Sequence, residues 1–337
     1  MKSKRNILAN LLAAAAMVMT AVGSTSCNVH EWPEEEHVES QALTLRLEFN
    51  TEMPEFVYEY TRAGEVPTTA NYIVRAYSVV DGNLKRDNFR EFAFTRTLSE
   101  GYDCETVVDL LPGDYRIMVW TDLGTGDGSL YYDSQDFADI HVTEPYTGNT
   151  DARDAFRGYL DVTVPSVAGE TPLSGVVEMS RPLAKYEFVS TGMQDFITRE
   201  LTRKGARDQK LNLDDYYVVV SYPQFMPSAF NMFTDRPANS LSGVQFRSEL
   251  SPYGNDEILL GFDYVFVGAT EGSVTVRLSV YSKSDGVLVA STPNVSVPLR
   301  RSFDTIVKGE FLLSTTSDGV GIDPGYDGEF NIFAPLK

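Results

Sequence analysis

Two cysteines are the residues of this 337-residue sequence whose context says most about chemistry. Cys27 follows a basic start, an apolar run from Ile7 to Val22 and small residues at 23–26. This order is that of a secretory signal with a small-residue cleavage site. A cysteine directly after the small residues is where a lipoprotein signal peptidase leaves a diacylated N-terminus. The sequence therefore predicts a signal peptide over residues 1–26 and a lipid anchor, such as palmitate, on Cys27.

The residues before Cys27 match only a permissive form of the lipoprotein signal. Ser26 suits the position before the cleaved bond, but Ser24 stands where such signals usually carry leucine. A secreted protein without lipid therefore remains the alternative. If Cys27 carries lipid, Cys104 has no cysteine left to pair with, and the hydrophobic cores must hold the protein together. We expect Cys104 to be a lone thiol near a loop or the start of a strand, with no catalytic role.

Residues 27–40 are polar, acidic and without periodicity, which predicts a flexible tether between the lipid and the first domain. An acidic cluster directly after a lipidated cysteine resembles the signal that sends some lipoproteins to the outer face of the outer membrane. The alternative is a solvated tether that carries no sorting signal. We expect a protein anchored by lipid in the outer membrane, at the cell surface.

Side chains typical of catalysis are scarce. His30 and His37 lie in the tether, and His141 stands alone in a predicted strand. The sequence has no Gly-x-Ser-x-Gly turn, no phosphate-binding glycine loop and no His-Glu-x-x-His motif. It therefore predicts no enzymatic activity and no cofactor, and it leaves open a pair of carboxylates whose separation a sequence does not give.

Two acidic loops are candidates for calcium. One runs from Asp122 to Asp133, and the other holds Asp318, Asp323, Asp327 and Glu329. Neither has the spacing of an EF-hand loop, and glycine with aspartate also makes ordinary turns. We interpret both as turns.

The chain is strongly acidic. Its formal net charge is −20, and a chain that begins at Cys27 has 25 basic against 48 acidic residues, or −23. Such a surface repels phosphate backbones, so nucleic acid is not expected as a partner. The length suffices for two domains of ordinary size.

Alternating apolar residues predict an all-β fold. Leu43, Leu45, Leu47 and Phe49 alternate with polar residues and define a first strand. Strands are also expected over 72–80, 89–97, 115–120, 216–221, 258–266 and 274–281. Asp81-Gly82 predicts a hairpin turn. Short strands with turn signals throughout predict two tandem β-sandwich domains, over residues 41–183 and 184–337.

One helix is expected in the second domain. Met193, Phe196 and Leu201 recur at helical spacing, and Thr191 with Gln194 is placed as a capping box. The aromatic segment 222–233 lacks a period of two and contains two prolines. It predicts either a loop packed over a core or an exposed patch for a partner.

Several segments together resemble the fimbrillin-like lipoproteins of the type V pilus system and their relatives of unknown function. They are the signal with Cys27 and the residues after it, Leu111–Asp122, Arg181–Lys185, Val297–Leu312 and Gly325–Ile332. The resemblance covers most of the chain, although each motif alone is weak.

The resemblance implies two transthyretin-like, Greek-key β-sandwiches exported as a lipidated precursor. In polymerising members a protease trims the first strand, and a strand of the next subunit fills the groove. Here Leu43–Phe49 would be the removable strand, and Arg62 lies in a plausible processing loop. The chain departs from the family pattern because it shows no separate donor strand at its C-terminus, which keeps an anchor or tip component open beside a pilus subunit.

The alternative function is a lipid-anchored surface module that binds a host or other glycan. Tyrosines are plentiful, with 18 in the chain, but sandwich cores also use tyrosine. Of the two tryptophans, Trp32 lies in the tether and Trp120 in the most core-like strand.

Overall fold

The computed structural model describes residues 39–49, 67–126, 128–167, 169, 171–207, 209–269 and 271–314, and the backbone of 329–335. Residues from Ser40 onward form one compact unit. Cys27 and Arg62 lie outside the described residues, so lipidation and processing stay predictions. Across the described ranges, no helix has the length and apolar content needed to span a bilayer.

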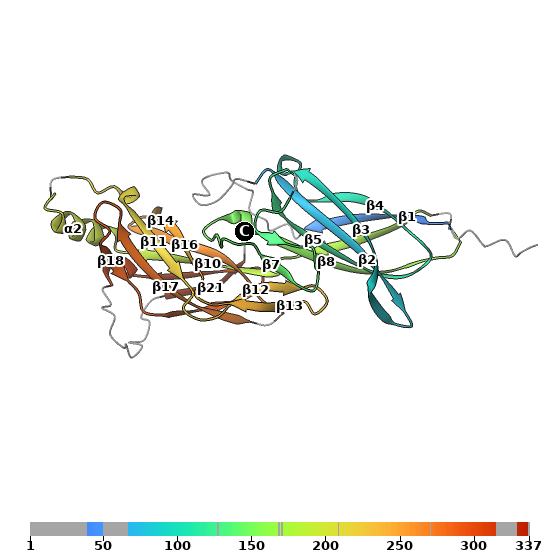
Figure 1. Ribbon diagram of the computed structural model, residues 1–337. Coiled ribbons are helices and arrows are strands. Elements are labelled where there is room, and N and C mark those ends of the chain that lie inside the picture. Colours follow the sequence, from blue (N-terminus) through green and yellow to red (C-terminus); the bar gives the residue numbers. More distant parts are fainter. Residues whose placement is uncertain are drawn as a thin grey trace, which may run out of the picture. The chain divides into compact units, whose positions relative to one another are not determined.

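The all-β fold is confirmed, and its first half is a sandwich of two sheets (Figure 1). One sheet has the order β4 (Cys104–Leu110), β1 (Gln41–Phe49), β9 (Leu173–Met179). The facing sheet has the order β3 (Asn83–Thr97), β2 (Thr69–Val80), β5 (Gly113–Gly124), β8 (Ala155–Val164). Apolar side chains from both sheets form one buried core, because every second residue of each strand points inward.

The predicted hairpin at Asp81-Gly82 is present between β2 and β3. Asp81 has φ 53° and Gly82 has φ 73°. Positive φ at both central residues is the geometry that twists with the flanking strands. The local sequence therefore fixes the pairing of β2 with β3.

The second half is a larger sandwich. One sheet has the order β15 (Ser251–Gly254), β16 (Glu257–Phe266), β10 (Leu183–Thr191), β20 (Phe303–Gly309), β21 (Glu329–Pro335). The other has the order β14 (Gln245–Glu249), β11 (Tyr216–Ser221), β17 (Gly272–Ser282), β18 (Leu288–Ser291), and β19 (Val295–Leu299) also pairs with β17. Short 3-10 turns are η1 (Leu98–Glu100), η2 (Asp151–Arg153), η3 (Leu213–Asp215) and η4 (Phe311–Leu313).

The two sandwiches share a pattern of strand pairing. β1 is antiparallel to β4 and parallel to β9, and β10 is antiparallel to β16 and parallel to β20. In each half, therefore, the first strand lies between an antiparallel and a parallel neighbour. This pattern supports two related sandwiches, although the exact division at residues 183 and 184 stays a prediction.

A smaller sheet and an aromatic cluster lie where the halves meet. The sheet has the order β13 (Arg236–Leu241), β12 (Met226–Asn231), β7 (Ile140–Val142), β6 (Tyr132–Asp133). Trp120 of β5, Phe230 of β12 and Phe266 of β16 belong to one buried cluster with Tyr132. Trp120 lies 5.7 Å from Tyr132 and 6.5 Å from Phe266 between ring centroids. Side chains of both halves thus share one core.

A buried ion pair also joins the halves. Arg153 of η2 donates from Nη1 to Asp263 Oδ1 of β16 at 3.1 Å, and the two side chains are 3% and 0% exposed. The hydroxyls of Tyr146 and Tyr222 donate to Asp263 Oδ2 at 2.6 and 2.7 Å. Burial raises the pKa of Asp263, and the Arg153 guanidinium opposes that rise. The carboxylate is tolerated there because it accepts several hydrogen bonds.

Two further ionic contacts lie beside it. Arg181, directly before β10, donates from Nε to both carboxylate oxygens of Asp154 at 2.9 Å. Asp235, in the turn between β12 and β13, accepts from Arg157 at 2.7 Å and from Arg301 at 2.7 Å. These guanidinium groups lower the pKa of Asp235 against the effect of its burial. The contacts join residues that are distant in sequence.

The expected helix is present as α2 (Met193–Arg203), but its predicted capping box is wrong. The N-cap is Gly192 with φ 75°, and no side chain at that position caps the helix. Asp256, which lies in the turn between β15 and β16, caps the helix instead. Its Oδ1 accepts from the Gln194 amide at 2.8 Å, and its carbonyl accepts from the Met193 amide at 3.3 Å. A residue distant in sequence thus satisfies the amides that a local cap would have bonded.

Candidate functional site

The candidate site is β1 together with the groove that it fills. β1 is hydrogen-bonded on both sides, to β4 from Gln41 to Leu47 and to β9 from Leu43 to Phe49. Leu43, Leu45 and Leu47 are 0% exposed. The strand therefore completes both the sheet and the core of the first sandwich.

The walls and floor of this groove are apolar. Val108 and Leu110 of β4 and Val177 and Met179 of β9 flank β1 and are buried. Fully burying one large apolar side chain contributes about 1.5–3 kcal/mol. Four such side chains on β1 give roughly 6–12 kcal/mol, which is similar to the entire net stability of a typical domain. Loss of β1 would therefore remove a large part of the stability of the first sandwich.

The C-terminal end of β1 is held by specific contacts. The Phe49 amide donates to Asp103 Oδ1 at 2.9 Å. The Phe49 ring lies edge-on to Tyr72 at 6.3 Å and to Phe156 at 5.1 Å between centroids. These contacts fix the register of the strand, because a shift by one residue would turn its leucines outward.

Cys104 begins β4 and lies opposite Leu47, on the buried side of the sheet. It is a free thiol with 7% exposure, as the sequence predicted. Burial raises the pKa of the Cys104 thiol. A thiol that is buried and protonated reacts slowly, so Cys104 can report whether β1 is in place.

The outward side of β1 is polar. Arg46 forms an ion pair with Glu48 and lies opposite Glu105 of β4. Val107 of β4 and Val176 of β9 are 56% and 46% exposed beside them. The sheet thus shows the usual alternation of a strand pair with one solvated face.

His141, the one histidine of the described chain, lies on the surface in β7. Its ring is 3.9 Å from Asp133 and 3.7 Å from Asp139, beside a shallow hollow that Glu144 also lines. Nowhere in the described ranges do three or more His, Cys, Asp or Glu side chains form a group suited to a metal ion. The second acidic loop, apart from the backbone at Glu329, lies outside those ranges.

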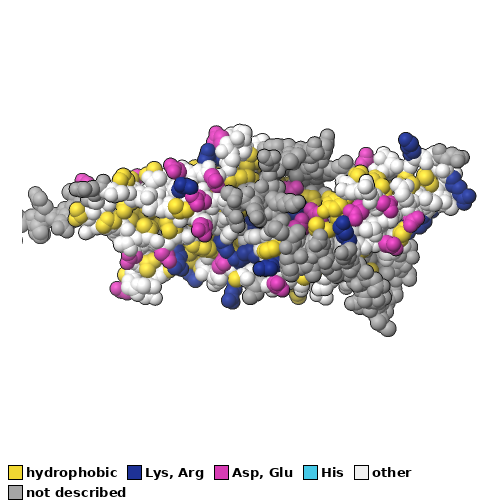
Figure 2. Space-filling model, turned by 180° about the vertical axis from the view of Figure 1, so that it is seen from behind, with side chains coloured by type: hydrophobic (Ala, Val, Ile, Leu, Met, Phe, Trp, Pro, Cys, Tyr) yellow, Lys and Arg dark blue, Asp and Glu magenta, His cyan; other side chains and the backbone are white. Residues whose placement is uncertain are grey.

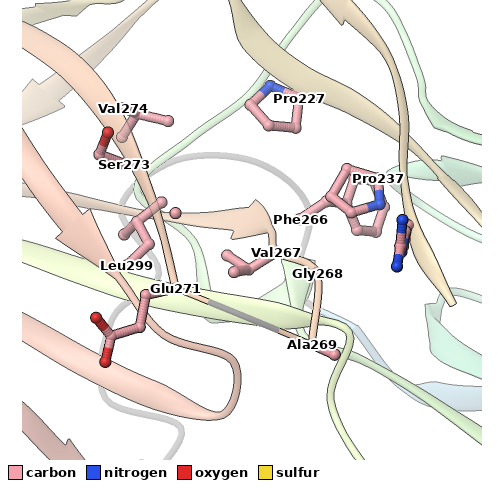
Figure 3. Close-up of a pocket in the computed structure, with 12 residues that line it drawn as sticks. Pro227, Pro237, Phe266, Val267, Gly268, Ala269, Glu271, Ser273, Val274 and Leu299 are labelled. Atoms are coloured by element: carbon pink, nitrogen blue, oxygen red, sulfur yellow. The ribbon is translucent and has the colours of Figure 1, made fainter.

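A second hollow, of about 420 Å³, lies between β12, β13 and the start of β17. Figure 3 shows Pro227 and Pro237 on one side and Ser273 and Val274 on the other. Its lining includes one basic side chain, Arg236, one acidic side chain, Glu271, and the hydroxyl of Ser273, with no histidine. The hollow offers no arrangement for bond-making chemistry.

Asp122, at the start of the first acidic loop, points into the protein. It is 2% exposed and accepts from Trp120 Nε1 at 2.8 Å and from Asn71 Nδ2 at 3.2 Å. Burial raises the pKa of Asp122 to about 6, and these donors moderate the rise. Its role is structural, since it satisfies the indole N–H inside the core.

We expect the stability cost of Asp122 to depend on pH. A carboxyl whose pKa is higher in the folded than in the unfolded protein loses stability as pH rises through that interval. Here the interval runs from about 4 to about 6, and two pKa units correspond to about 3 kcal/mol. The free energy of unfolding of Asp122→Asn, relative to that of the native protein, should therefore rise by roughly this amount as the pH goes from 4 to 7. Urea denaturation at each pH measures it. A difference between the two proteins that is constant over this range would contradict the assignment.

The aromatic segment 222–233 forms neither a simple loop nor an exposed patch. It contains β12, and Tyr222, Met226 and Phe230 are buried, whereas Phe225 is 72% exposed. The segment is thus a core strand with one exposed ring before it. The two prolines and the broken alternation concealed this strand in the sequence.

The exposed surface is charged with both signs. Figure 2 shows acidic side chains scattered over the described part of one face, with basic side chains between them. The negative charge of the chain is therefore distributed and not collected into one acidic site on that face.

Comparison with known proteins gives a family and a set of similar folds. The model of a family of unknown function (DUF6562) matches residues 35–334. No curated protein matches the chain. Among solved structures, the chain is similar to a candidate adhesin from Bacteroides thetaiotaomicron, with 12% identity, a TM-score of 0.42 and coverage of 82% of this chain and 93% of that one.

Two fimbrial proteins from Porphyromonas gingivalis are also similar in structure. The anchor protein Mfa2 has 12% identity and a TM-score of 0.38, with 79% of this chain and 90% of that chain covered. The tip protein Mfa3 with a C-terminal truncation has 10% identity and a TM-score of 0.39, with 83% and 96% covered.

Proposed function

The chain belongs to the family of unknown function DUF6562, and from this premise we propose that it is a lipid-anchored structural or adhesion protein of the cell surface, of the fimbrillin type. The proposal includes a place in a pilus as subunit, anchor or tip component. It assigns no catalytic activity. The observation that carries it is the position of β1.

β1 is an exchangeable element by its place in the chain. One cut after the strand would separate it from the body, whereas β10, its counterpart in the second sandwich, is continuous with the chain at both ends. Arg62 comes after β1 in the sequence, and the cut is proposed there. Loss of β1 would expose one edge of β4 and one edge of β9.

An exposed groove of this kind favours a strand from another chain. Unpaired backbone groups on two edges would bond an incoming strand, and the apolar pockets would select alternating large side chains. Because an empty groove costs much of the domain's stability, we expect the cut protein to open only transiently until an entering strand fills the groove.

The anchor in this proposal is the lipid on Cys27. The acidic tether then spans the distance to β1, which begins at Gln41. A single acyl group binds membranes weakly, whereas the several chains of a mature lipoprotein hold it firmly. The body would then stand in solution at the outer membrane surface, kept soluble by its negative charge.

Strand exchange can be followed with Cys104 as a reporter. In a Cys27→Ala protein Cys104 is the one remaining thiol. We expect slow reaction with Ellman's reagent in the intact protein and faster reaction after a trypsin-like protease has cut at Arg62. A labelled peptide with the sequence of residues 41–49 should then be taken up and should protect the thiol again.

The matched control is the same peptide with Leu45→Glu, which keeps the length but places a charge in the core. It should neither bind nor protect. Release of the natural strand without uptake of the natural peptide would refute strand exchange, and so would a thiol that stays protected after the cut under dilute urea.

A second candidate function is glycan binding at the surface. The observation that favours it is the outward side of the second sandwich, where the exposed Arg247 lies over the Tyr217 ring and Tyr217 stacks on Tyr281. Both tyrosines are half-buried, whereas Tyr131 and Tyr132 are buried in the aromatic cluster.

A further inference from the structure

The outward face of the sheet β14-β11-β17-β18 carries an unusual set of side chains. β11 lies between β14 and β17, so outward residues stand in rows across the three strands (Figure 1). One row is Glu249, Tyr217, Tyr281; the next is Arg247, Val219, Ser279; the third is Gln245, Ser221, Arg277. We call these nine residues the arginine–tyrosine face.

Arg247 is held in a fixed orientation. Its guanidinium lies 3.5 Å from the centroid of the Tyr217 ring. Tyr217 in turn stacks on Tyr281, with centroids 5.3 Å apart and an angle of 18° between the planes. Stacking engages the flat side of the guanidinium and leaves the N–H groups, which lie in its plane, for hydrogen bonds.

Arg277 is oriented by a neutral group. Its Nε donates to Asn294 Oδ1 at 3.0 Å. Within the described part of the chain, neither Arg247 nor Arg277 forms an ion pair with a carboxylate, in contrast to the arginines that join the two sandwiches. Both side chains are exposed. Two oriented and unneutralised guanidinium groups thus lie on one face of a chain with 48 acidic and 28 basic residues.

The stacked tyrosines alone could be explained as a cross-strand pair, which stabilises a sheet by about 0.2–1 kcal/mol. That explanation does not account for the two arginines, because neither forms an ion pair within the described chain, and Glu249 on the same face is paired with Lys283 at 2.8 Å. The stacking on Tyr217 does limit the kind of ligand that the face can bind. Both sides of the Tyr217 ring are covered, so a sugar cannot stack on it, and recognition must come from the charged and polar groups.

The geometry points to a carboxylate-bearing ligand. A planar guanidinium matches a carboxylate with two parallel hydrogen bonds. Arg277 lies on β17, which has a neighbour on each side, whereas β14, the strand of Arg247, is at the edge of the sheet. A peptide that pairs with that edge would lie two strands away from Arg277, so an acidic peptide strand is disfavoured as a partner of both arginines. A polysaccharide needs no strand edge, and its hydroxyls can bond the side chains of Gln245, Ser221 and Ser279.

We propose that the arginine–tyrosine face binds an acidic polysaccharide, with uronate carboxylates on Arg247 and Arg277. The proposal rests on the second candidate function and names its site and ligand class. Charge complementarity favours an acidic over a neutral glycan. A neutral sugar ring cannot stack on Tyr217, because both sides of that ring are covered, whereas carboxylates can bind the two oriented guanidinium groups.

The test uses the full-length protein and polygalacturonate, with calorimetry at low salt. Arg247→Gln together with Arg277→Gln should weaken binding by about tenfold for each lost charge-assisted contact. Methyl-esterified polygalacturonate, which has the same backbone without the charge, should not bind. Higher salt should weaken binding, since the face is exposed.

The control variant is Arg90→Gln with Arg116→Gln, which removes the same charge from the first sandwich and should bind as the native protein does. Denaturation midpoints check that both variants are folded. Binding of polyglutamate as tight as that of polygalacturonate would assign the face to acidic polymers in general and overturn the proposal. Absence of binding, or equal loss in the control, would also overturn it. Strand exchange at β1 is measured separately, so each proposal can fail alone.

Discussion

Asp263→Ala is expected to lower the free energy of unfolding by about 3–5 kcal/mol, the largest effect among the substitutions considered. The change leaves the Arg153 guanidinium, with a side chain 3% exposed, without its carboxylate. It also removes the acceptor of the Tyr146 and Tyr222 hydroxyls. An unpaired buried charge costs several kcal/mol, and each orphaned hydroxyl adds to that cost. Urea denaturation measures the difference directly.

The matched control is Asp161→Ala. Asp161 pairs with Arg116 on the surface, with side chains 65% and 44% exposed, and its loss should cost less than about 1 kcal/mol. A double change of Arg153 to Met and Asp263 to Leu should recover much of the loss, because it removes both charges together. If Asp263→Ala costs no more than Asp161→Ala, the pair does not hold the halves together.

Leu45→Ala in β1 is expected to destabilise the first sandwich by about 2–5 kcal/mol. Leu45 is 0% exposed at the centre of the strand, so the deleted atoms leave a cavity between the two sheets. The next residue provides the control: Arg46 points outward with a side chain 61% exposed, and Arg46→Ala should change stability by less than about 1 kcal/mol.

The same pair of variants connects stability to strand release. If β1 is the exchangeable strand, Leu45→Ala should raise the reactivity of Cys104 at urea concentrations below the main unfolding transition, and Arg46→Ala should not. Equal thiol reactivity in both variants, or exposure of Cys104 together with global unfolding alone, would show that β1 does not leave separately.

Much of the fold follows from local sequence. The alternation from Leu43 to Phe49 predicted β1, and Asp81-Gly82 predicted the hairpin of β2 and β3, because a period of two and a two-residue turn are encoded within a few residues. Helical spacing located α2 in the same way. Burial of Trp120 was also foreseen, since its strand is apolar on both sides.

The rest depends on partners that sequence patterns do not name. The cap of α2 comes from Asp256, and the register of β1 depends on β9, which follows much later in the chain. β12 escaped prediction because its strand pairs and buried faces are set by β7, β13 and β16, while its local pattern is broken by proline. Tertiary contacts override weak local signals of this kind.

In the candidate sites, too, local features could be predicted from the sequence, whereas contacts between distant strands could not. The sequence identified β1 as the element of interest, and it gave Cys104 as a lone thiol, but it could not place that thiol opposite Leu47. Arg247 and Arg277 are far apart in sequence and share one face of the sheet only because β14 and β17 both pair with β11. Their outward alternation was a usable signal, yet the strand order that joins them was not.

The parallel pairing of β1 with β9 has a consequence for how the chain folds. Leu43 meets Val108 on one side and Leu173 on the other, so the sheet cannot close until most of the first sandwich has been made. Contacts between such distant segments form slowly, because a long loop must be closed first. During synthesis the leucines of β1 are therefore unprotected for longer than any hairpin in the molecule, and a holding chaperone would have its best target there.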